Sequence, residues 1–219
     1  MNFTFEGKGN EYDGRWFPVV WGDEIPEQIA INPVDIEVLG EEFECHPSHI
    51  DAILHVEAGR TGFLLREKPP CRPKILFEGH YFYKLTPKPV SRTRPDLSYK
   101  HWTRRYYKGG SAEWTRLRDA ADFDIKNALK SASWGLGQVM GANHKLAGCE
   151  TIEEFIVEAF SSERNQLRHM INFISNSGLL NSLRGGHWDE VAHGYNGPAY
   201  LKNHYDSKLA HAAKHSEFA

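Results

Sequence analysis

Apolar residues recur at helical spacing in two neighbouring stretches near the beginning of the chain. The first stretch runs from Pro33 to about Phe43, and the second starts at Pro47, a residue type that suits the first turn of a helix. Two helices are therefore predicted here. The second should end near Gly59, because glycine is common just after a helix C-terminus.

One position interrupts the apolar stripe of the second helix. Ile50, Ile53 and Leu54 share one face, and the next position on that face is Glu57. A carboxylate among apolar neighbours loses hydration of its charged form, which is expected to raise its pKa, and a carboxyl group that stays protonated can act as a general acid. The alternative is a glutamate that reaches solvent at the helix end or pairs with Arg60.

The remainder of the chain is predicted to be mostly helical. Residues 111–130 keep helical spacing over the longest stretch. Thr151 and Glu154 form a T-x-x-E capping box, which predicts the start of another helix. Further helices are expected over residues 163–176, 187–194 and 198–214.

A small β element is predicted between the first and the central helices. Residues 74–85, K-I-L-F-E-G-H-Y-F-Y-K-L, are rich in β-branched and aromatic side chains and are predicted to form a strand or one arm of a hairpin. Residues 86–95 carry three prolines and should form an exposed loop. Residues 1–26 are interpreted as an extended lead-in and residues 27–219 as one domain, so the predicted fold class is mainly α with a small β element (α+β).

Two further stretches could bind a ligand. In S-A-S-W-G-L-G-Q-V-M-G, residues 131–141, Ser133 and Gln138 could hydrogen-bond to hydroxyl or acetamido groups, Trp134 could stack on a sugar face, and Gly135 could let the backbone approach a ligand. The alternative is a helix turn with packing glycines.

The second stretch lies near the C-terminal end of the chain, between two predicted helices. Tyr195 and Asn196 stand just before Gly197 and Pro198 there, so an aromatic hydroxyl and an amide could face a cleft. An ordinary turn with a buried tyrosine is an equally good interpretation.

Composition excludes several classes of function. The net charge is -3 at pH 7, with acidic and basic residues interspersed, so nucleic acid is not expected as a partner. The sequence contains no run of about 18 apolar residues, so no stable membrane insertion is expected. The first residues lack a basic segment followed by an apolar one, so no cleaved export signal is expected.

Cysteine and histidine usage gives no strong sign of a disulfide framework or a metal site. Cys45, Cys71 and Cys149 are widely spaced, which suits a reduced compartment, although a pair between Cys45 and Cys71 stays open. The 12 histidines form no H-E-x-x-H motif. We therefore predict no metal and no cofactor, and we expect a monomer.

The strings V-E-A-G, R-P-K-I-L-F-E-G-H-Y-F-Y-K, S-A-S-W-G-L-G-Q-V-M-G and Y-N-G-P-A-Y follow one another over roughly residues 45–210. Their order resembles the N-acetylmuramidase domain of bacteriophage endolysins and, more distantly, goose-type lysozymes and lytic transglycosylases. The resemblance implies a lysozyme-like fold with Glu57 as the catalytic acid. It places Gly135, Gln138, Tyr195 and Asn196 in the substrate cleft, together with Leu136 and Met140. Relatives commonly have serine after the glutamate, whereas this chain has Ala58.

The resemblance also implies an activity and a setting. The expected reaction is hydrolysis of the β-1,4 bond between N-acetylmuramic acid and N-acetylglucosamine in peptidoglycan glycan strands. Phage lysis is the expected context, with access to the cell wall provided by a separate membrane-permeabilising protein.

Direct attack by water needs a second carboxylate. Glu78 is favoured over Asp96, Asp122 and Asp124, although Glu78 could instead pair with Arg72 or His80. A lytic transglycosylase, which needs one acid/base, shares every motif. A non-catalytic wall-binding module is a further alternative.

Overall fold

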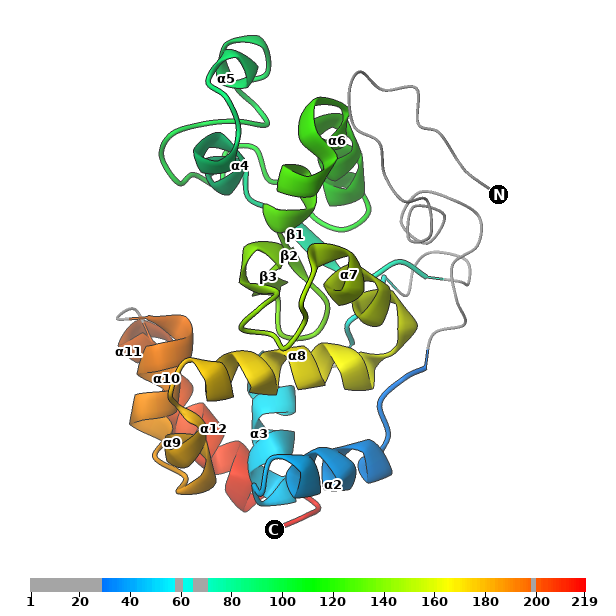
Figure 1. Cartoon of the computed structure of the whole chain (residues 1–219). Coiled ribbons are helices and arrows are strands. Elements are labelled where there is room, and N and C mark those ends of the chain that lie inside the picture. The colour runs from blue at the N-terminus through cyan, green and yellow to red at the C-terminus, as the bar shows by residue number, and fades with distance from the viewer. Residues whose placement is uncertain (1–28, 58–60, 65–70, 198–199) are drawn as a thin grey trace.

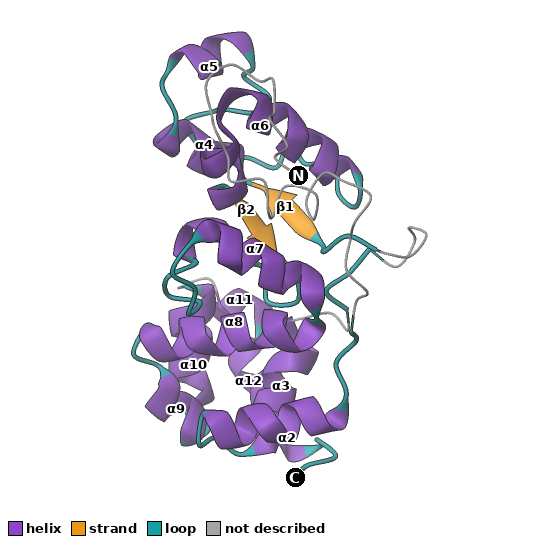
Figure 2. Cartoon of the chain, turned by 45° about the vertical axis from the view of Figure 1, so that its right-hand side comes forward, coloured by secondary structure: helices purple, strands orange, loops and turns teal. Residues whose placement is uncertain are grey.

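Two groups of helices lie on either side of a small sheet (Figures 1 and 2). The computed structural model describes residues 29–57, 61–64, 71–197 and 200–219. On one side of the sheet are α4 (Gly79–Leu85), α5 (Pro89–Thr93) and α6 (Ala112–Lys130). The other side contains α2 (Pro33–Glu42), α3 (Pro47–Glu57), α8 (Glu163–Asn176), α9 (Leu180–Arg184), α10 (Trp188–Asn196), α11 (Tyr200–Asn203) and α12 (Tyr205–Lys214). Helix α7 (Ile152–Ser161) lies between α8 and the sheet. The mainly helical fold with a small β element is confirmed.

Helix α3 ends where the sequence predicts. Ile50 and Ile53 are almost fully buried and Leu54 is 9% exposed, so the apolar stripe faces the core. Glu57, the next position on that stripe, is the last residue of the helix. Gly59 lies outside the described residues, as do the lead-in over residues 1–26 and its boundary with the domain.

The later helices agree with prediction in most places. Helix α6 is the longest described helix, and α8 has the predicted bounds. The Thr151 hydroxyl accepts a hydrogen bond from the Glu154 amide at 3.1 Å and so caps α7, but the Glu154 carboxylate accepts from the Glu150 amide instead of completing the capping box. The single helix predicted over 198–214 is divided at His204, where φ is 52°. Helix α9 was not predicted.

The strand predicted over residues 74–85 is wrong beyond Phe77. Strand β1 (Ile75–Phe77) pairs antiparallel with β2 (Ala132–Trp134), which pairs with β3 (Val139–Met140). After Glu78 the chain turns into α4 at Gly79, where a Cβ atom would lie 2.3 Å from the ring of Tyr99. The aromatic residues of this stretch thus follow a helical period, and Phe82 is buried against Phe77 with ring centroids 5.6 Å apart.

Two other local predictions need correction. The proline-rich stretch contains α5, because Pro89 occupies a first-turn position that tolerates proline. Residues 131–141 form the β2–β3 hairpin, with Gly135 to Gln138 as its four-residue turn. None of the described helices is long and apolar enough to cross a membrane. Cys45 is a free thiol, so it is not bonded to Cys71.

The packing around Trp114 connects α6 to the sheet and to α7. Its ring is 1% exposed and meets Trp134 and Phe160 edge to face, with both centroid distances 5.6 Å. Its indole nitrogen donates to the carbonyl oxygen of Pro73 at 2.9 Å. These contacts fix the sheet against α6, and with it the hairpin turn that faces the second group of helices.

Candidate active site

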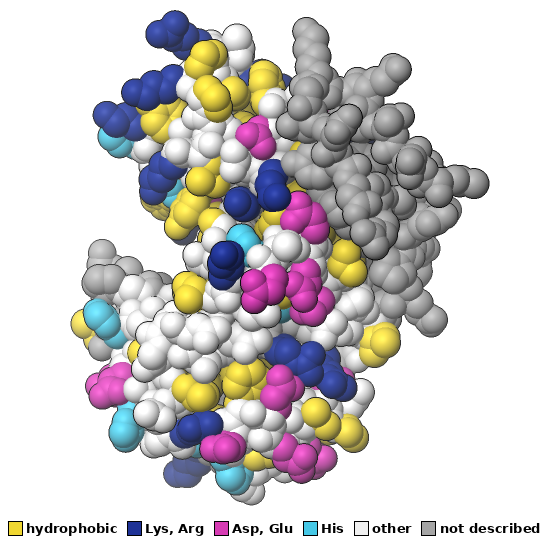
Figure 3. All heavy atoms as spheres, viewed as in Figure 1, with side chains coloured by type: hydrophobic (Ala, Val, Ile, Leu, Met, Phe, Trp, Pro, Cys, Tyr) yellow, Lys and Arg dark blue, Asp and Glu magenta, His cyan; other side chains and the backbone are white. Residues whose placement is uncertain are grey.

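A groove of about 420 Å³ opens where the hairpin faces α8, α10 and α12. The surface is hollowed between the two groups of helices on this side of the molecule (Figure 3). The groove brings together two stretches that the sequence proposed separately, the hairpin turn and the region of Tyr195. Its lining residues are Gly137, Gln138, Val139, Met140, Asn143, Phe173, Tyr195 and Tyr205.

The hairpin turn is built from two residues with positive φ, Gly135 at 65° and Gln138 at 49°. The side chain of Gln138 is exposed, and its amide braces the turn. Its Oε1 accepts from the Ser133 hydroxyl at 2.8 Å, and its Nε2 donates to the carbonyl oxygen of Gly135 at 2.9 Å. Nε2 also lies 3.4 Å from the carbonyl oxygen of Lys74, so it is the second lone pair of Oε1 that can accept a hydrogen bond from a ligand in the groove.

Tyr195 connects α10 to the same turn. Its hydroxyl donates to the carbonyl oxygen of Gly137 at 2.7 Å, and its ring meets Phe173 of α8 edge to face at 5.8 Å. Asn196 is the last residue of α10, and the geometry of its side chain lies outside the described residues. The structure therefore places Tyr195 in the groove with a defined orientation.

Trp134 does not fit its predicted role. Its ring is 2% exposed, its nitrogen donates to the carbonyl oxygen of Leu129 at 3.1 Å, and Trp114 packs against it. A ring in this position has no face available to a sugar. Ser133 is also buried, and its hydroxyl donates a hydrogen bond to the side chain of Gln138.

Two residues that the sequence analysis missed hold the site together from the first turn of α8. The Glu163 carboxylate accepts hydrogen bonds from the Thr61 hydroxyl at 2.9 Å and the Gly62 amide at 2.7 Å, just beyond the end of α3. Gln166 accepts from the Leu136 amide in the hairpin turn at 2.9 Å. A Cβ atom at Gly62 would lie 1.7 Å from the Gln166 side-chain oxygen, so the two segments meet at this side chain.

The end of α3 lies next to the start of α12, a helix that also lines the groove. Val56, next to Glu57, lines a second hollow with Ser207 and Lys208 of α12. Tyr205, in the same turn of α12, lines the first groove. The first turn of α12 therefore borders both hollows, and α3 ends one residue after Val56 of the second hollow.

Glu78 lies at the far end of β1 from the hairpin turn. Its Oε2 accepts a hydrogen bond from the Tyr107 hydroxyl at 2.6 Å. The same oxygen lies 3.1 Å from Nδ1 of His80, one of its two suggested partners, but Nδ1 makes no hydrogen bond with any described residue. Burial and the hydrogen bond to this carboxylate raise the pKa of Tyr107 well above its ordinary value, so its hydroxyl stays protonated and donates. The side chain of Glu78 is 14% exposed.

Comparison with known proteins decides the family. A family profile described as N-acetylmuramidase matches residues 46–217. The chain belongs to the N-acetylmuramidase family. Among solved structures, the endolysin of Burkholderia AP3 phage has 29% sequence identity to this muramidase and a TM-score of 0.79, over 95% of this chain and 79% of the other. No curated protein matches the chain.

The family match confirms the resemblance to N-acetylmuramidases that the sequence shows. The similarity to the phage endolysin structure confirms the lysozyme-like fold. Membership supports a glycosidase-type enzyme whose substrate is peptidoglycan.

Proposed function

We propose that this muramidase hydrolyses the β-1,4 bond between N-acetylmuramic acid and N-acetylglucosamine, with Glu57 as the general acid. The observation that carries the proposal is the position of Glu57. It ends α3 on the stripe that Ile50 and Ile53 bury, and α3 packs against α12, whose Tyr205 lines the groove together with Gln138 and Tyr195. Family membership supports the same reaction.

The end of a helix favours a protonated carboxyl group. The last turn carries the negative end of the helix dipole, which disfavours an ionised carboxylate there, and apolar neighbours disfavour it further. A protonated acid can donate to the glycosidic oxygen as the bond breaks. Gln138, Tyr195 and Asn196 are proposed to contact the glycan, with Gly135 setting the shape of the turn.

Glu78 is proposed as the second carboxylate, which would activate the attacking water. Two of the other candidates have structural tasks, because Asp96 accepts two hydrogen bonds from Arg94 and Asp124 accepts from the backbone of Asn127. Asp122 is exposed on α6. Glu78 is shielded, and its contacts with Tyr107 and His80 both involve Oε2, so Oε1 is the oxygen proposed to accept the proton of the attacking water.

The test of the acid is Glu57→Gln, assayed by the clearing of purified peptidoglycan. Glutamine preserves size but cannot donate an acidic proton, and general acid catalysis contributes about 10²–10⁴-fold. We expect a loss of that size, with Glu41→Gln on the exposed face of α2 as the control that keeps activity. A folded Glu57→Gln variant with a third of wild-type activity would refute the assignment.

Product analysis tests the reaction type. Hydrolysis leaves a reducing N-acetylmuramic acid end, whereas a lytic transglycosylase leaves an anhydro end that is lighter by one water. Mass spectrometry of digested peptidoglycan should show reducing ends. Glu78→Gln should strongly reduce their formation, and full activity in this variant would remove Glu78 from the mechanism.

A further inference from the structure

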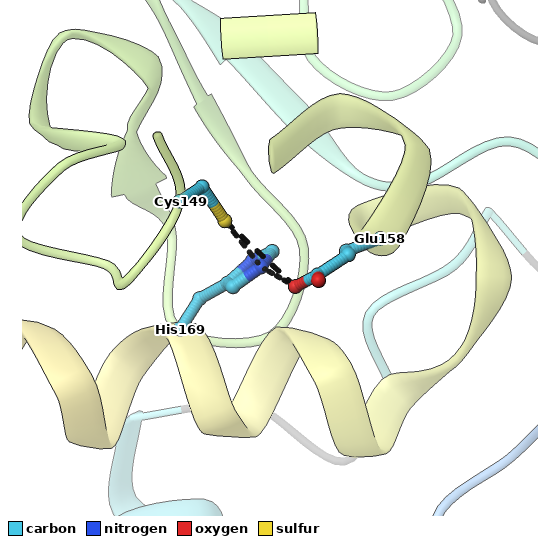
Figure 4. A group of neighbouring side chains, drawn as sticks. All are labelled: Cys149, Glu158 and His169. Atoms are coloured by element: carbon cyan, nitrogen blue, oxygen red, sulfur yellow. Dashed lines mark hydrogen bonds and ion pairs between the residues drawn. The ribbon is translucent and has the colours of Figure 1, made fainter. Parts of the chain in front are cut away.

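Three side chains from separate elements meet away from the groove (Figure 4). Cys149 precedes α7, Glu158 lies on α7 and His169 lies on α8. The Nε2 atom of His169 is 3.5 Å from the Cys149 sulfur and 2.7 Å from Glu158 Oε2, and the sulfur is 3.8 Å from the same oxygen. Three potential ligand atoms thus surround one point, all within 4.8 Å of one another.

The surrounding structure fixes this cluster before any ligand binds. The Cys149 amide donates to the carbonyl oxygen of His144 at 2.9 Å, and Asn172 of α8 donates to the carbonyl oxygen of Ala147 at 3.2 Å. The ring of His169 stacks on Phe155, with centroids 4.5 Å apart and planes 23° apart. The backbone of Cys149 and the ring of His169 are therefore held in place, so little freedom is lost on binding.

The geometry does not suit a nucleophilic cysteine. In a catalytic triad the histidine uses one ring nitrogen for the nucleophile and the other for the carboxylate. Here the sulfur and the carboxylate both face Nε2. Burial, with Glu158 nearby, raises the pKa of Cys149 to about 12, so the thiol is not activated.

We propose that Cys149, Glu158 and His169 form a binding site for a divalent zinc-type metal ion. Thiolate, imidazole and carboxylate are the three ligand types that zinc takes in proteins. In tetrahedral zinc geometry the sulfur lies about 3.6 Å from each of the other two ligand atoms, close to the observed 3.5 and 3.8 Å.

One distance must change when the metal binds. The nitrogen and the oxygen would lie about 3.3 Å apart around zinc, so their present 2.7 Å contact must open by about 0.6 Å. The side chain of Glu158 is 35% exposed, which gives it room to move and gives the ion an entry path. Water from the same side can supply the fourth ligand.

The proton balance of binding follows from the contacts. The 2.7 Å contact with a carboxylate oxygen places a proton on His169 Nε2 in the metal-free protein. Coordination needs the lone pair of Nε2, so the ring proton moves to Nδ1, and the thiol of Cys149 releases its proton to solvent. One proton therefore leaves for each ion bound to the neutral ring.

The ion would join the loop before α7 to both α7 and α8. Helix α8 carries Glu163 and Gln166, the two residues that hold the groove segments. The role of the metal is thus to stabilise the frame of the active site and not to take part in the reaction. The metal would stabilise this frame whichever residue is the catalytic acid.

The test is a titration of untagged, chelator-treated protein with Co²⁺ and Zn²⁺. We expect one equivalent of Co²⁺ to give a sulfur-to-cobalt charge-transfer band that Zn²⁺ abolishes. The band separates this site from surface histidines, which contribute no sulfur. At a Zn²⁺ concentration 100 times Kd, Tm should rise by about 5–10 °C, and EDTA should reverse the rise.

Variants assign the site. Cys149→Ser and His169→Gln should lose the band and the rise in Tm, whereas Cys45→Ser, which changes another buried thiol, should keep both. If Cys149→Ser does not fold, X-ray absorption of the Zn²⁺-loaded wild-type protein must show one sulfur ligand. Absence of the band and of a sulfur ligand in wild type, or a band that survives Cys149→Ser, would overturn the proposal.

Discussion

Replacing Glu163 by glutamine should loosen the segment that follows α3. The carboxylate is 4% exposed and accepts three hydrogen bonds, two at Oε1 from Thr61 and Gly62 and one at Oε2 from the Ile31 amide at 3.1 Å. Glutamine has one oxygen to accept with. Whichever way its amide turns, an N–H group then faces at least one backbone N–H donor.

The hydrogen bonds that Glu163→Gln weakens or removes determine the loss of unfolding free energy. If the glutamine oxygen accepts from Thr61 and Gly62, the half-buried Ile31 amide loses its acceptor, which costs about 1–3 kcal/mol. The two remaining bonds become neutral instead of charge-assisted, at about 1 kcal/mol each. The amide is cheaper to bury than the carboxylate, so the net loss of unfolding free energy should be about 2–4 kcal/mol. Urea unfolding should show a midpoint lower by about 1 M.

Activity gives a second readout of the same change. Peptidoglycan clearing by the folded variant should fall several-fold, because Thr61 and Gly62 follow Glu57 closely in the chain. The matched control is Glu153→Gln on α7, whose carboxylate lies 3.3 Å from the exposed Lys126 amine and should matter by less than about 1 kcal/mol. A Glu163→Gln midpoint equal to that of Glu153→Gln would refute the reasoning.

Three further predictions concern the groove and its surroundings. Tyr195→Phe removes the hydrogen bond to Gly137, so the free energy of unfolding should fall by about 0.5–1.5 kcal/mol. KM should rise more than kcat falls, and an unchanged KM would exclude a role in binding. Gly135→Ala should lower Tm more than Gly110→Ala. Both glycines have positive φ, but only at Gly135 would the added Cβ atom meet the Gln166 side chain, at 2.5 Å. Equal losses of Tm would show that φ alone matters. Basic side chains gather over α4 and α5 (Figure 3). Glutamine at three exposed arginines, one on α5 and two in the segment between α5 and α6, should lower activity at low salt and have little effect at high salt. Equal salt dependence of variant and wild type would exclude steering. The three positions are Arg92, Arg104 and Arg105.

Helical periodicity predicted the fold where helices are long and one-sided. The apolar stripes that bury Leu117 and Leu167 are visible in the sequence of α6 and α8 because each spans several turns. The hairpin was missed because strands of three and two residues are too short to show alternation. In α4 the aromatic content suggested a strand, but close packing at Gly79 turns the chain into a helix.

The candidate site could be predicted only in part. Gln138 and Tyr195 come from separate strings of the sequence, and in the structure both line one groove. Trp134 could not be assigned, because sequence does not tell a buried indole from one that binds a sugar. Glu163 was missed because a glutamate at a helix start is ordinarily explained by the helix dipole. Its partner Gly62 lies 101 positions away, a separation that local patterns do not reveal.

The left-handed backbone of Gln138 has a consequence for the evolution and engineering of this enzyme. A residue with a Cβ atom at φ 49° costs about 1–2 kcal/mol that glycine would not incur. Glycine at this position would remove that cost, but it would also remove the two hydrogen bonds by which the amide braces the turn, so the two effects on stability oppose each other. If that amide contacts the glycan as proposed, selection for lytic activity retains glutamine at this residue, and libraries screened by heat alone will not detect its loss.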